Sequence, residues 1–223
     1  MRKHFIVAID GPAGSGKSTV SRITARRLKL QYIYTGAMYR ALTLKAIRKG
    51  LDLGDESALT ALARGTVIGL RSEGDLMKVS LDGEDVSARI RTPELTNKVK
   101  YVARIPGVRE EMVEQQREIG RRVGAVLEGR DIGTVVFPNA DYKFYLDADV
   151  DERARRRCKE LKSLGEDVNA EQIRKDVIAR DRSDMERSVG ALKKAPDAFV
   201  IDTTRLTIEQ VVQKILSIVK RDS

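Results

Sequence analysis

The sequence predicts an α/β protein built around a parallel sheet. Short apolar runs rich in β-branched residues alternate with segments of helical periodicity, and a glycine-rich turn joins the first run to the first helix. Uninterrupted apolar runs are typical of strands that helices cover on both faces, and strand–helix alternation is typical of parallel order. The expected strands are 5–9, 32–34, 125–129, 142–146 and 198–201.

Helices are expected between these strands. They are predicted over 17–30, over 37–49, where Gly50 ends the helix, and over 108–122. The last helix is the best marked, because Thr207 and Gln210 have the spacing of a capping box. Its expected buried face consists of Ile208, Val211, Val212, Ile215 and Val219.

Residues 62–100 have a different sequence pattern from the rest of the chain. Apolar and polar residues alternate there, and "EGD" and "DGED" are turn signals. This pattern predicts a small antiparallel β-lobe inserted into the parallel α/β architecture.

Length and charge restrict the class of protein. The chain has 223 residues, enough for one core with an inserted lobe or for two small domains. Its formal net charge of +9 raises the possibility of nucleic-acid binding, but only 4% of residues are aromatic and neither end carries a basic tail. Arginines scattered beside glycines and carboxylates favour an enzyme that handles several phosphates, although part of the charge serves solubility. We expect no nucleic-acid partner.

Rare residues and hydropathy exclude further classes. Cys158 is the only cysteine, so no internal disulfide can form, and the only histidine, His4, has no partner at metal-ligand spacing. No apolar run approaches the roughly 20 residues that span a bilayer, and the start of the chain lacks the apolar region and cleavage site of a signal peptide. We therefore expect a cytoplasmic protein without a membrane partner.

The strongest motif is "GPAGSGKS", from Gly11 to Ser18, which matches G-x-x-x-x-G-K-[ST] in full. It follows an expected strand and opens an expected helix, which makes a plain strand–turn–helix junction a poor alternative. The motif defines a P-loop NTPase, in which backbone amides surround an oxyanion, Lys17 reaches the β- and γ-phosphates, and Ser18 joins a Mg²⁺ shell. The expected ATP-binding residues are Gly11, Pro12, Ala13, Gly14, Ser15, Gly16, Lys17, Ser18 and Thr19.

The receiving substrate should be bound by arginines and carboxylates far from this loop. Three clusters provide them: Thr35 and Arg40 in "YTGAMYR", Arg130 and Asp131 in "EGRDIGTVVFP", and Arg180, Asp184 and Arg187 in "RDRSDMER". Each alone could be a structural ion pair or a solvated helix face. No N-K-x-D motif for guanine occurs, so a small-molecule kinase is favoured over a GTPase.

In this order, the P-loop, "TGAMYR", "LDGEDVSARIRTPEL", "PGVRE", "EGRDIGTVVFP" and "RDRSDMER" resemble the bacterial cytidylate kinases. The resemblance extends from about Ile6 to Val219 and implies transfer of the γ-phosphate of ATP to CMP or dCMP. It also implies a five-stranded parallel sheet in a single nucleoside-monophosphate-kinase domain over 1–223. Its expected parts are a core (1–34, 103–150 and 188–223), an acceptor lobe (about 35–102) and a helical lid (about 151–187).

The resemblance also implies roles for individual residues. The acceptor phosphate would be held by Thr35, Arg40 and Arg130, the cytosine edge by Arg109 and Asp131, and the sugar by Arg180 and Asp184. The lid segment "DERARRRCKEL" would supply Arg153, Arg156 and Arg157 to the ATP phosphates. The expected catalytic set is Lys17, Arg130, Arg153, Arg157 and Arg187.

Two positions depart from the family pattern. Many relatives have an aspartate where this chain has Tyr34, and Lys100 stands where relatives often carry a serine that touches the pyrimidine. The departure at Lys100 affects how strictly the enzyme is expected to select the base of its acceptor nucleotide. Kinases of UMP or AMP and an RNA-associated P-loop protein remain the alternative functions, and the family resemblance suggests a monomer.

Overall fold

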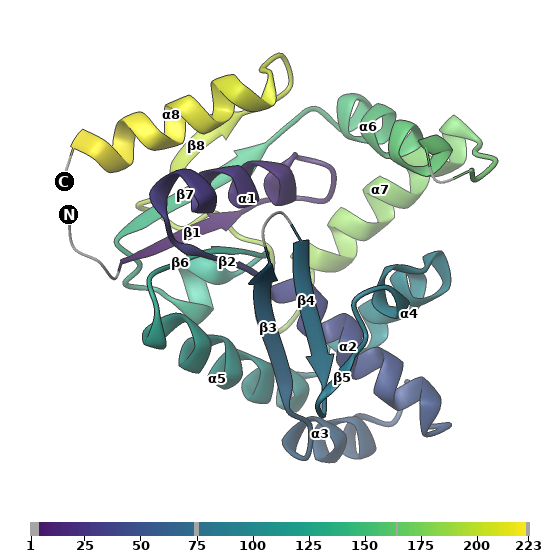
Figure 1. Ribbon diagram of the computed structural model, residues 1–223. Helices are drawn as coiled ribbons and strands as arrows, with labels where there is room; N and C mark the ends of the chain where they lie inside the picture. The colour runs from purple at the N-terminus through teal and green to yellow at the C-terminus, as the bar shows by residue number, and fades with distance from the viewer. Residues whose placement is uncertain (1–4, 74–75, 164, 222–223) are drawn as a thin grey trace.

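The computed structural model describes residues 5–73, 76–163 and 165–221. Its main sheet has five parallel strands in the order β2-β6-β1-β7-β8 (Figure 1). The strands are β1 (Ile6–Asp10), β2 (Gln31–Tyr34), β6 (Ala125–Glu128), β7 (Tyr142–Asp147) and β8 (Phe199–Asp202). Both the parallel order and the positions of these strands are confirmed. All five carboxyl ends meet at one edge of the sheet, where ligands bind in this architecture.

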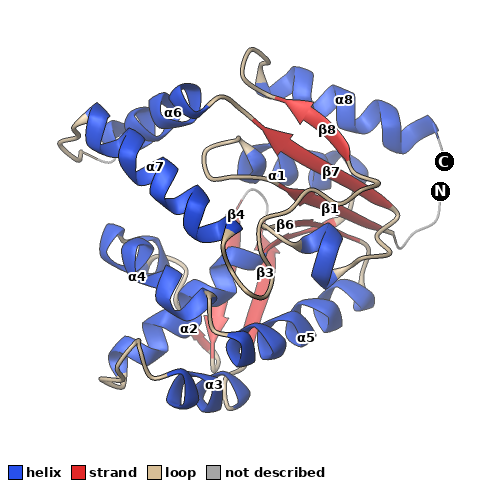
Figure 2. Cartoon of the chain, turned by 180° about the vertical axis from the view of Figure 1, so that it is seen from behind, coloured by secondary structure: helices blue, strands red, loops and turns tan. Residues whose placement is uncertain are grey.

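Helices cover both faces of this sheet. Val7, Ile9 and Val126 pack beneath α1 and α8, whereas Ile33 and Leu127 point to the other face, toward α2 and α5. Figure 2 shows α6 and α7 side by side beyond the sheet edge. The helices are α1 (Lys17–Leu28), α2 (Thr35–Arg48), α3 (Glu56–Arg64), α4 (Pro93–Ala103), α5 (Pro106–Arg122), α6 (Val150–Ser163), α7 (Ala170–Met185) and α8 (Ile208–Arg221).

The inserted lobe is shorter than the sequence analysis expected. A second sheet, antiparallel and separate from the first, contains β3 (Ile68–Glu73), β4 (Leu76–Leu81) and β5 (Glu84–Asp85). The remainder of 62–100 is largely helical, with the end of α3, a short 3₁₀ helix at Arg89–Arg91 and α4. The missed signal is Thr92, whose hydroxyl accepts from the Leu95 amide and caps α4, with Pro93 at its first turn.

The ends of the predicted helices are largely correct. Gly50, at φ 66°, follows α2 as expected, although α2 begins at Thr35 because β2 runs into it without a loop. The capping box of α8 is confirmed, since the Thr207 amide donates to Gln210 Oε1 (2.9 Å) and the Gln210 amide donates to Thr207 Oγ1 (3.2 Å). Ile208 is 47% exposed and was wrongly assigned to the buried face.

Other expectations concern features outside the sheet. Cys158 is a free thiol, and His4 lies outside the described residues. In the described ranges, no three His, Cys, Asp or Glu side chains come together in a way that could hold a metal ion. No helix there is long and apolar enough to cross a membrane.

Candidate active site

The glycine-rich loop between β1 and α1 has the backbone conformation that an anion site requires. Gly11, Gly14 and Gly16 have φ angles of 145°, 78° and 88°, which side-chain-bearing residues rarely adopt. A Cβ at Gly11 would lie 2.0 Å from the carbonyl oxygen of Leu146 in β7. Among the described residues no side chain caps α1 at Gly16, so the first-turn amides and the helix dipole are left for a ligand.

Lys17 lies within this loop as a buried cation. It is 6% exposed, and its Nζ donates to the Pro12 carbonyl (2.5 Å) and to Ser15 Oγ (3.3 Å). It forms no ion pair with a carboxylate in the described part of the chain. Burial and repulsion from Arg130 lower the pKa of Lys17 well below its ordinary value. A buried amine of this kind is stabilised in its charged form when an anion binds beside it.

Glu128, at the end of β6, is a site residue that the sequence analysis missed. Its Oε2 accepts from Ser18 Oγ (3.0 Å), its Oε1 accepts from the Tyr32 hydroxyl, and the side chain is 1% exposed. Burial raises the pKa of Glu128. The available signal was an acidic residue at the carboxyl end of an apolar strand, where such a residue faces the ligand edge.

Asp10, the last residue of β1, anchors the segment that follows Arg130 and Asp131, two residues predicted to bind the acceptor. Its carboxylate accepts from the amides of Ile132 (2.9 Å) and Gly133 (2.7 Å). These amides open the π-helical turn Ile132–Val136, directly after Arg130 and Asp131. Burial raises the pKa of Asp10 to about 7. The sequence analysis did not assign a role to Asp10.

On the acceptor side, the predicted residues from three elements form paired charges. Arg130 Nε donates to Asp184 Oδ2 (2.7 Å), and Arg187 donates to the other oxygen of the same carboxylate. Burial works to raise the pKa of Asp184, but attraction from Arg130 and Arg187 holds it below its ordinary value. Arg109, from α5, forms an ion pair with Asp131.

Two predicted arginines on this side have no carboxylate partner in the described ranges. Arg40 donates to the Ile90 carbonyl (3.0 Å) and to Thr96 Oγ1 (2.7 Å), both neutral groups. Arg180, on α7, forms no ion pair, and burial together with repulsion from Arg130 lowers its pKa. Two cations without neutralising partners on one side of the site favour a negatively charged ligand there.

Two other predicted residues, Thr35 and Arg109, already use their polar groups in contacts within the protein. Thr35 Oγ1 donates to the Glu128 carbonyl (2.8 Å), so its single proton is already used. Arg109 is 2% exposed because the backbone at Gly190 rests on its guanidinium, where a Cβ would lie 2.2 Å from Nη2. The segment around Gly190 therefore covers part of the Arg109 guanidinium.

The arginines of α6 that the sequence analysis assigned to a lid differ from one another. Arg153 donates to Asp181 (2.6 Å) and to the carbonyls of Ala148 and Ala13 (2.9 and 3.2 Å), and so connects α6, α7 and the P-loop. Arg157 pairs with Glu160 on its own helix (2.7 Å), which does not bring it to the loop.

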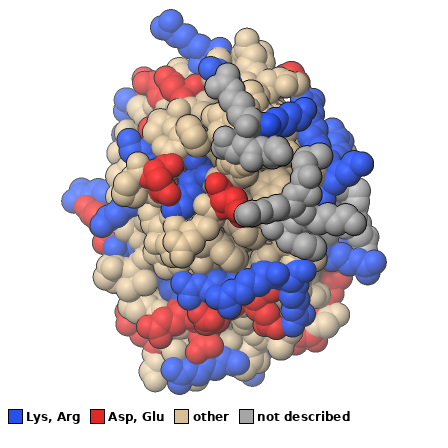
Figure 3. Space-filling view, turned by 90° about the vertical axis from the view of Figure 1, so that its left-hand side faces the viewer, with Lys and Arg blue, Asp and Glu red and all other residues tan. Residues whose placement is uncertain are grey.

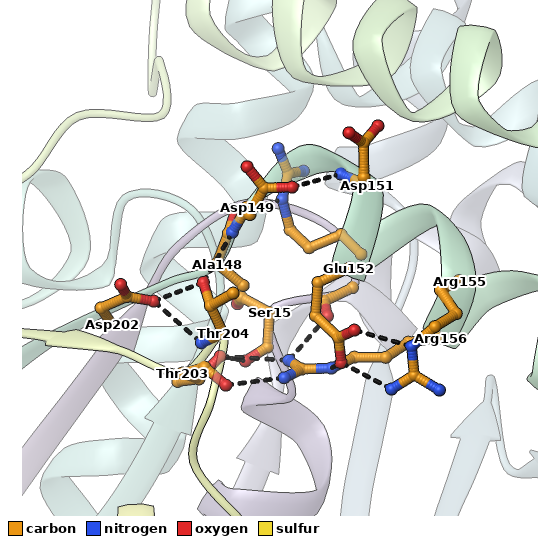
Figure 4. A network of polar contacts seen from close by, with 12 residues as sticks. Ser15, Ala148, Asp149, Asp151, Glu152, Arg155, Arg156, Asp202, Thr203 and Thr204 are labelled. Carbon is orange, nitrogen blue, oxygen red and sulfur yellow. Dashed lines mark hydrogen bonds and ion pairs between the residues drawn. The ribbon is translucent and has the colours of Figure 1, made fainter.

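Arg156 connects α6 to the segment after β8 (Figure 4). Its guanidinium donates to Thr203 Oγ1 (3.1 Å), to the Thr203 carbonyl (2.7 Å) and to Glu152 (2.8 Å). Thr203 Oγ1 in turn donates to the Ser15 carbonyl (3.1 Å), so this network reaches the P-loop. Lys100 lies apart from these groups, exposed on α4, with its ammonium 5.0 Å from the centre of the Tyr101 ring.

A P-loop at the ligand edge of a parallel sheet, facing unneutralised arginines, defines a phosphotransferase of the P-loop kinase class. The model of the cytidylate kinase family matches residues 7–221. The chain belongs to the cytidylate kinase family and phosphorylates a nucleoside monophosphate.

Two curated relatives support this assignment. The cytidylate kinase of Desulforamulus reducens is 51% identical over 221 residues, with 99% of each chain covered, and that of Bacillus subtilis (strain 168) is 48% identical over 223 residues, with 100% of each covered. An uncharacterized protein from Eubacterium ventriosum (TM-score 0.54, 11% identity, 97% and 99% covered) is similar in fold alone. So is a gluconokinase from Sinorhizobium meliloti (TM-score 0.50, 12% identity, 99% and 94% covered).

Proposed function

We propose that this enzyme transfers the γ-phosphate of ATP to CMP and dCMP, giving CDP or dCDP and ADP. The observation that carries the proposal is the pair of arginines, Arg40 and Arg180, that form no ion pair with a carboxylate among the described residues. Membership of the cytidylate kinase family supports cytidine nucleotides as the acceptors.

On the donor side, the amides of the loop from Gly11 to Thr19 bind the ATP phosphates, and Lys17 spreads the charge that develops during transfer. Ser18 and Glu128 present hard oxygen donors beside this loop, which fits Mg²⁺. Ser18 and Glu128 would hold Mg²⁺, which neutralises charge on the β- and γ-phosphates when it is bound.

On the acceptor side, Arg40 and Arg130 bind the phosphate of CMP, whose oxygen attacks in line without a protein nucleophile. Asp131 accepts from the exocyclic amine of cytosine, and Arg109 donates to the ring acceptors once the Gly190 segment has moved away. Arg180 and Asp184 bind the sugar. Arg187 stabilises the transferred phosphoryl group, which requires it to leave Asp184.

The proposal also covers the parts of the domain, the closure of its lid, its oligomeric state and its location in the cell. Helices α6 and α7 form a lid over about 151–187, the acceptor lobe spans about 35–102, and the rest of the chain is the core. Closure of the lid excludes water and so suppresses ATP hydrolysis. Arg153 and Arg157 clamp the ATP phosphates in that state, for which Arg157 must turn from Glu160. The enzyme acts as a cytoplasmic monomer.

A coupled assay of ADP release against CMP, dCMP, UMP and AMP, with Mg²⁺ and with excess chelator, tests this function. We expect CMP and dCMP to give the highest kcat/KM and chelation to abolish turnover. A preference for UMP or AMP would overturn the acceptor assignment.

The RNA-associated alternative is tested with the same preparation. Figure 3 shows a short band of basic side chains on this face with acidic side chains gathered directly beneath it, which is unlike a continuous phosphate-binding surface. We expect no steeply salt-dependent RNA binding. Tight RNA binding without acceptor-stimulated ATP turnover would replace the kinase proposal.

A further inference from the structure

Tyr34 ends β2 at the ligand edge of the sheet, beside the residues proposed to bind the acceptor. It pairs in register with Glu128 of β6, and its ring bends over the start of α2. A Cβ at Gly36 would lie 2.6 Å from the ring and 3.0 Å from the hydroxyl oxygen. The absence of a side chain at Gly36 therefore makes room for the phenol.

The surroundings of this phenol are positively charged. Arg130 and Arg180 both lie close enough to the Tyr34 hydroxyl to interact with it electrostatically. The side chain is half-buried, and no described residue forms a hydrogen bond with its hydroxyl. A half-buried hydroxyl with an unused proton, beside two guanidinium groups, is arranged to donate to an anion.

The neighbouring hydroxyl cannot do this. Thr35, the next residue, donates its only proton to the Glu128 carbonyl (2.8 Å). Tyr32, two residues earlier on the same face of β2, donates to the Glu128 carboxylate. Of the three hydroxyls at this strand end, the one on Tyr34 is the donor still available.

We propose that the Tyr34 hydroxyl donates a hydrogen bond to the phosphate of the acceptor nucleotide, so that Tyr34 is a phosphate-binding residue of this enzyme. The inference rests on the proposed function, because it takes the acceptor to be a nucleoside monophosphate. A phenol supplies a donor without a charge. It therefore adds to the binding by Arg40 and Arg130 without repelling the dianion, as a carboxylate at this position would.

Tyr34→Phe removes this donor and keeps the ring over Gly36. We expect the Kd of CMP, measured by titration calorimetry without ATP, to rise about tenfold, since hydrogen bonds to charged groups are the stronger ones. The Kd of cytidine, measured by competition at millimolar concentration, and the Kd of ATP should not change. Tyr34→Asp should weaken CMP binding more than Tyr34→Phe does.

Tyr142→Phe is the matched control, because its hydroxyl donates to the Val219 carbonyl (3.2 Å) at the start of β7, away from the ligand edge. It should bind CMP as the unaltered enzyme does. The inference is overturned if Tyr34→Phe binds CMP with unchanged Kd, if cytidine loses affinity in proportion, or if Tyr34→Asp binds CMP as tightly as the unaltered enzyme.

If the proposed function were wrong, the titrations of the unaltered enzyme would give a different result. The unaltered enzyme would then bind another monophosphate in preference to CMP, and the same variants titrated with that nucleotide would decide the role of Tyr34. If the unaltered enzyme bound no nucleoside monophosphate, both the function and the role of Tyr34 would be wrong.

Discussion

The loop from Gly11 to Ser18 presents its binding groups through the backbone, whereas several of the side chains on the proposed acceptor side form ion pairs with one another. In the loop, positive φ angles and uncapped amides are in place without a ligand. On the acceptor side, Asp184 accepts from Arg130 and Arg187. The loop is therefore preorganised in the free protein, and the proposed binding of an acceptor by Arg130 or Arg187 would exchange an existing ion pair for a new one.

This difference has an energetic consequence. Lys17 is buried and forms no ion pair with a carboxylate among the described residues, so we expect its charge to destabilise the free protein and to favour the proposed binding of phosphate. Asp184, in contrast, compensates two largely buried guanidinium groups and so stabilises the free protein. Removing Lys17 should therefore impair catalysis without lowering stability, whereas removing Asp184 should also lower stability.

Lys17→Ala is the change with the largest expected effect. Without the cation at the β- and γ-phosphates, we expect kcat to fall about a thousandfold or more. The free energy of unfolding should stay constant or rise, because a desolvated charge is lost. Steady-state kinetics and urea unfolding measure the two effects. A kcat near that of the unaltered enzyme would remove the central role of the loop.

Asp184→Asn tests the other half of the comparison. Loss of the carboxylate leaves Arg130 and Arg187 without their partner, and we expect the free energy of unfolding to fall by about 3 kcal/mol. Asp176→Asn, at an exposed position on the same helix, is the control and should change stability little. Urea unfolding without nucleotide measures both. An Asp184→Asn protein as stable as the unaltered one would refute the structural role of these ion pairs.

The ion pairs of Asp184 with Arg130 and Arg187 also predict that stability depends on pH. Attraction from Arg130 and Arg187 holds the pKa of Asp184 below its ordinary value in the folded protein, so its contribution to stability is present above the ordinary pKa of an aspartate and is lost as the pH falls through the folded-state pKa. The difference between the unaltered enzyme and Asp184→Asn should therefore shrink in acid. A difference that stays constant down to the acid transition would mean that the charge of Asp184 is not its source.

Asp131→Asn tests base recognition within the acceptor half. The amide cannot accept from the cytosine amine as a charged group, so we expect kcat/KM for CMP to fall about thirtyfold relative to that for UMP. Asp131→Asn also weakens the ion pair with Arg109, and thermal unfolding is therefore measured beside the kinetics. Equal losses for CMP and UMP would reject the assignment of Asp131 to the base.

The comparison also explains what could be predicted from sequence. The P-loop is local, because eight consecutive residues specify the turn and the helix that follows. The contact between Arg130 and Asp184 joins residues 54 positions apart, and that between Ser18 and Glu128 joins residues 110 apart. No local pattern specifies such pairs. The family resemblance supplied the acceptor residues but not their partners in the free protein.

The antiparallel sheet of the inserted lobe was predicted correctly, but its extent was not. The alternation of apolar and polar residues between Thr66 and Thr92 resembles strands, but Thr92 followed by Pro93 begins a helix. In this segment the cap decides the structure, because a proline at the first turn needs no amide partner and fits a helix start. Both the cap and the alternation were visible in the sequence, and only the alternation was used.

The smallest predicted effect concerns a feature that the sequence did specify locally. Thr207→Ala removes the side-chain acceptor of the α8 capping box, and we expect the free energy of unfolding to fall by about 1 kcal/mol. Thr207→Ser keeps an oxygen in place and should lose much less. Because α8 packs on α1 away from the ligand edge, kcat and the KM values should stay constant in both variants.

Equal destabilisation by alanine and serine would show that the hydroxyl is not the stabilising group. A fall in kcat would show that the scaffold beneath the P-loop is coupled to the preorganised donor site.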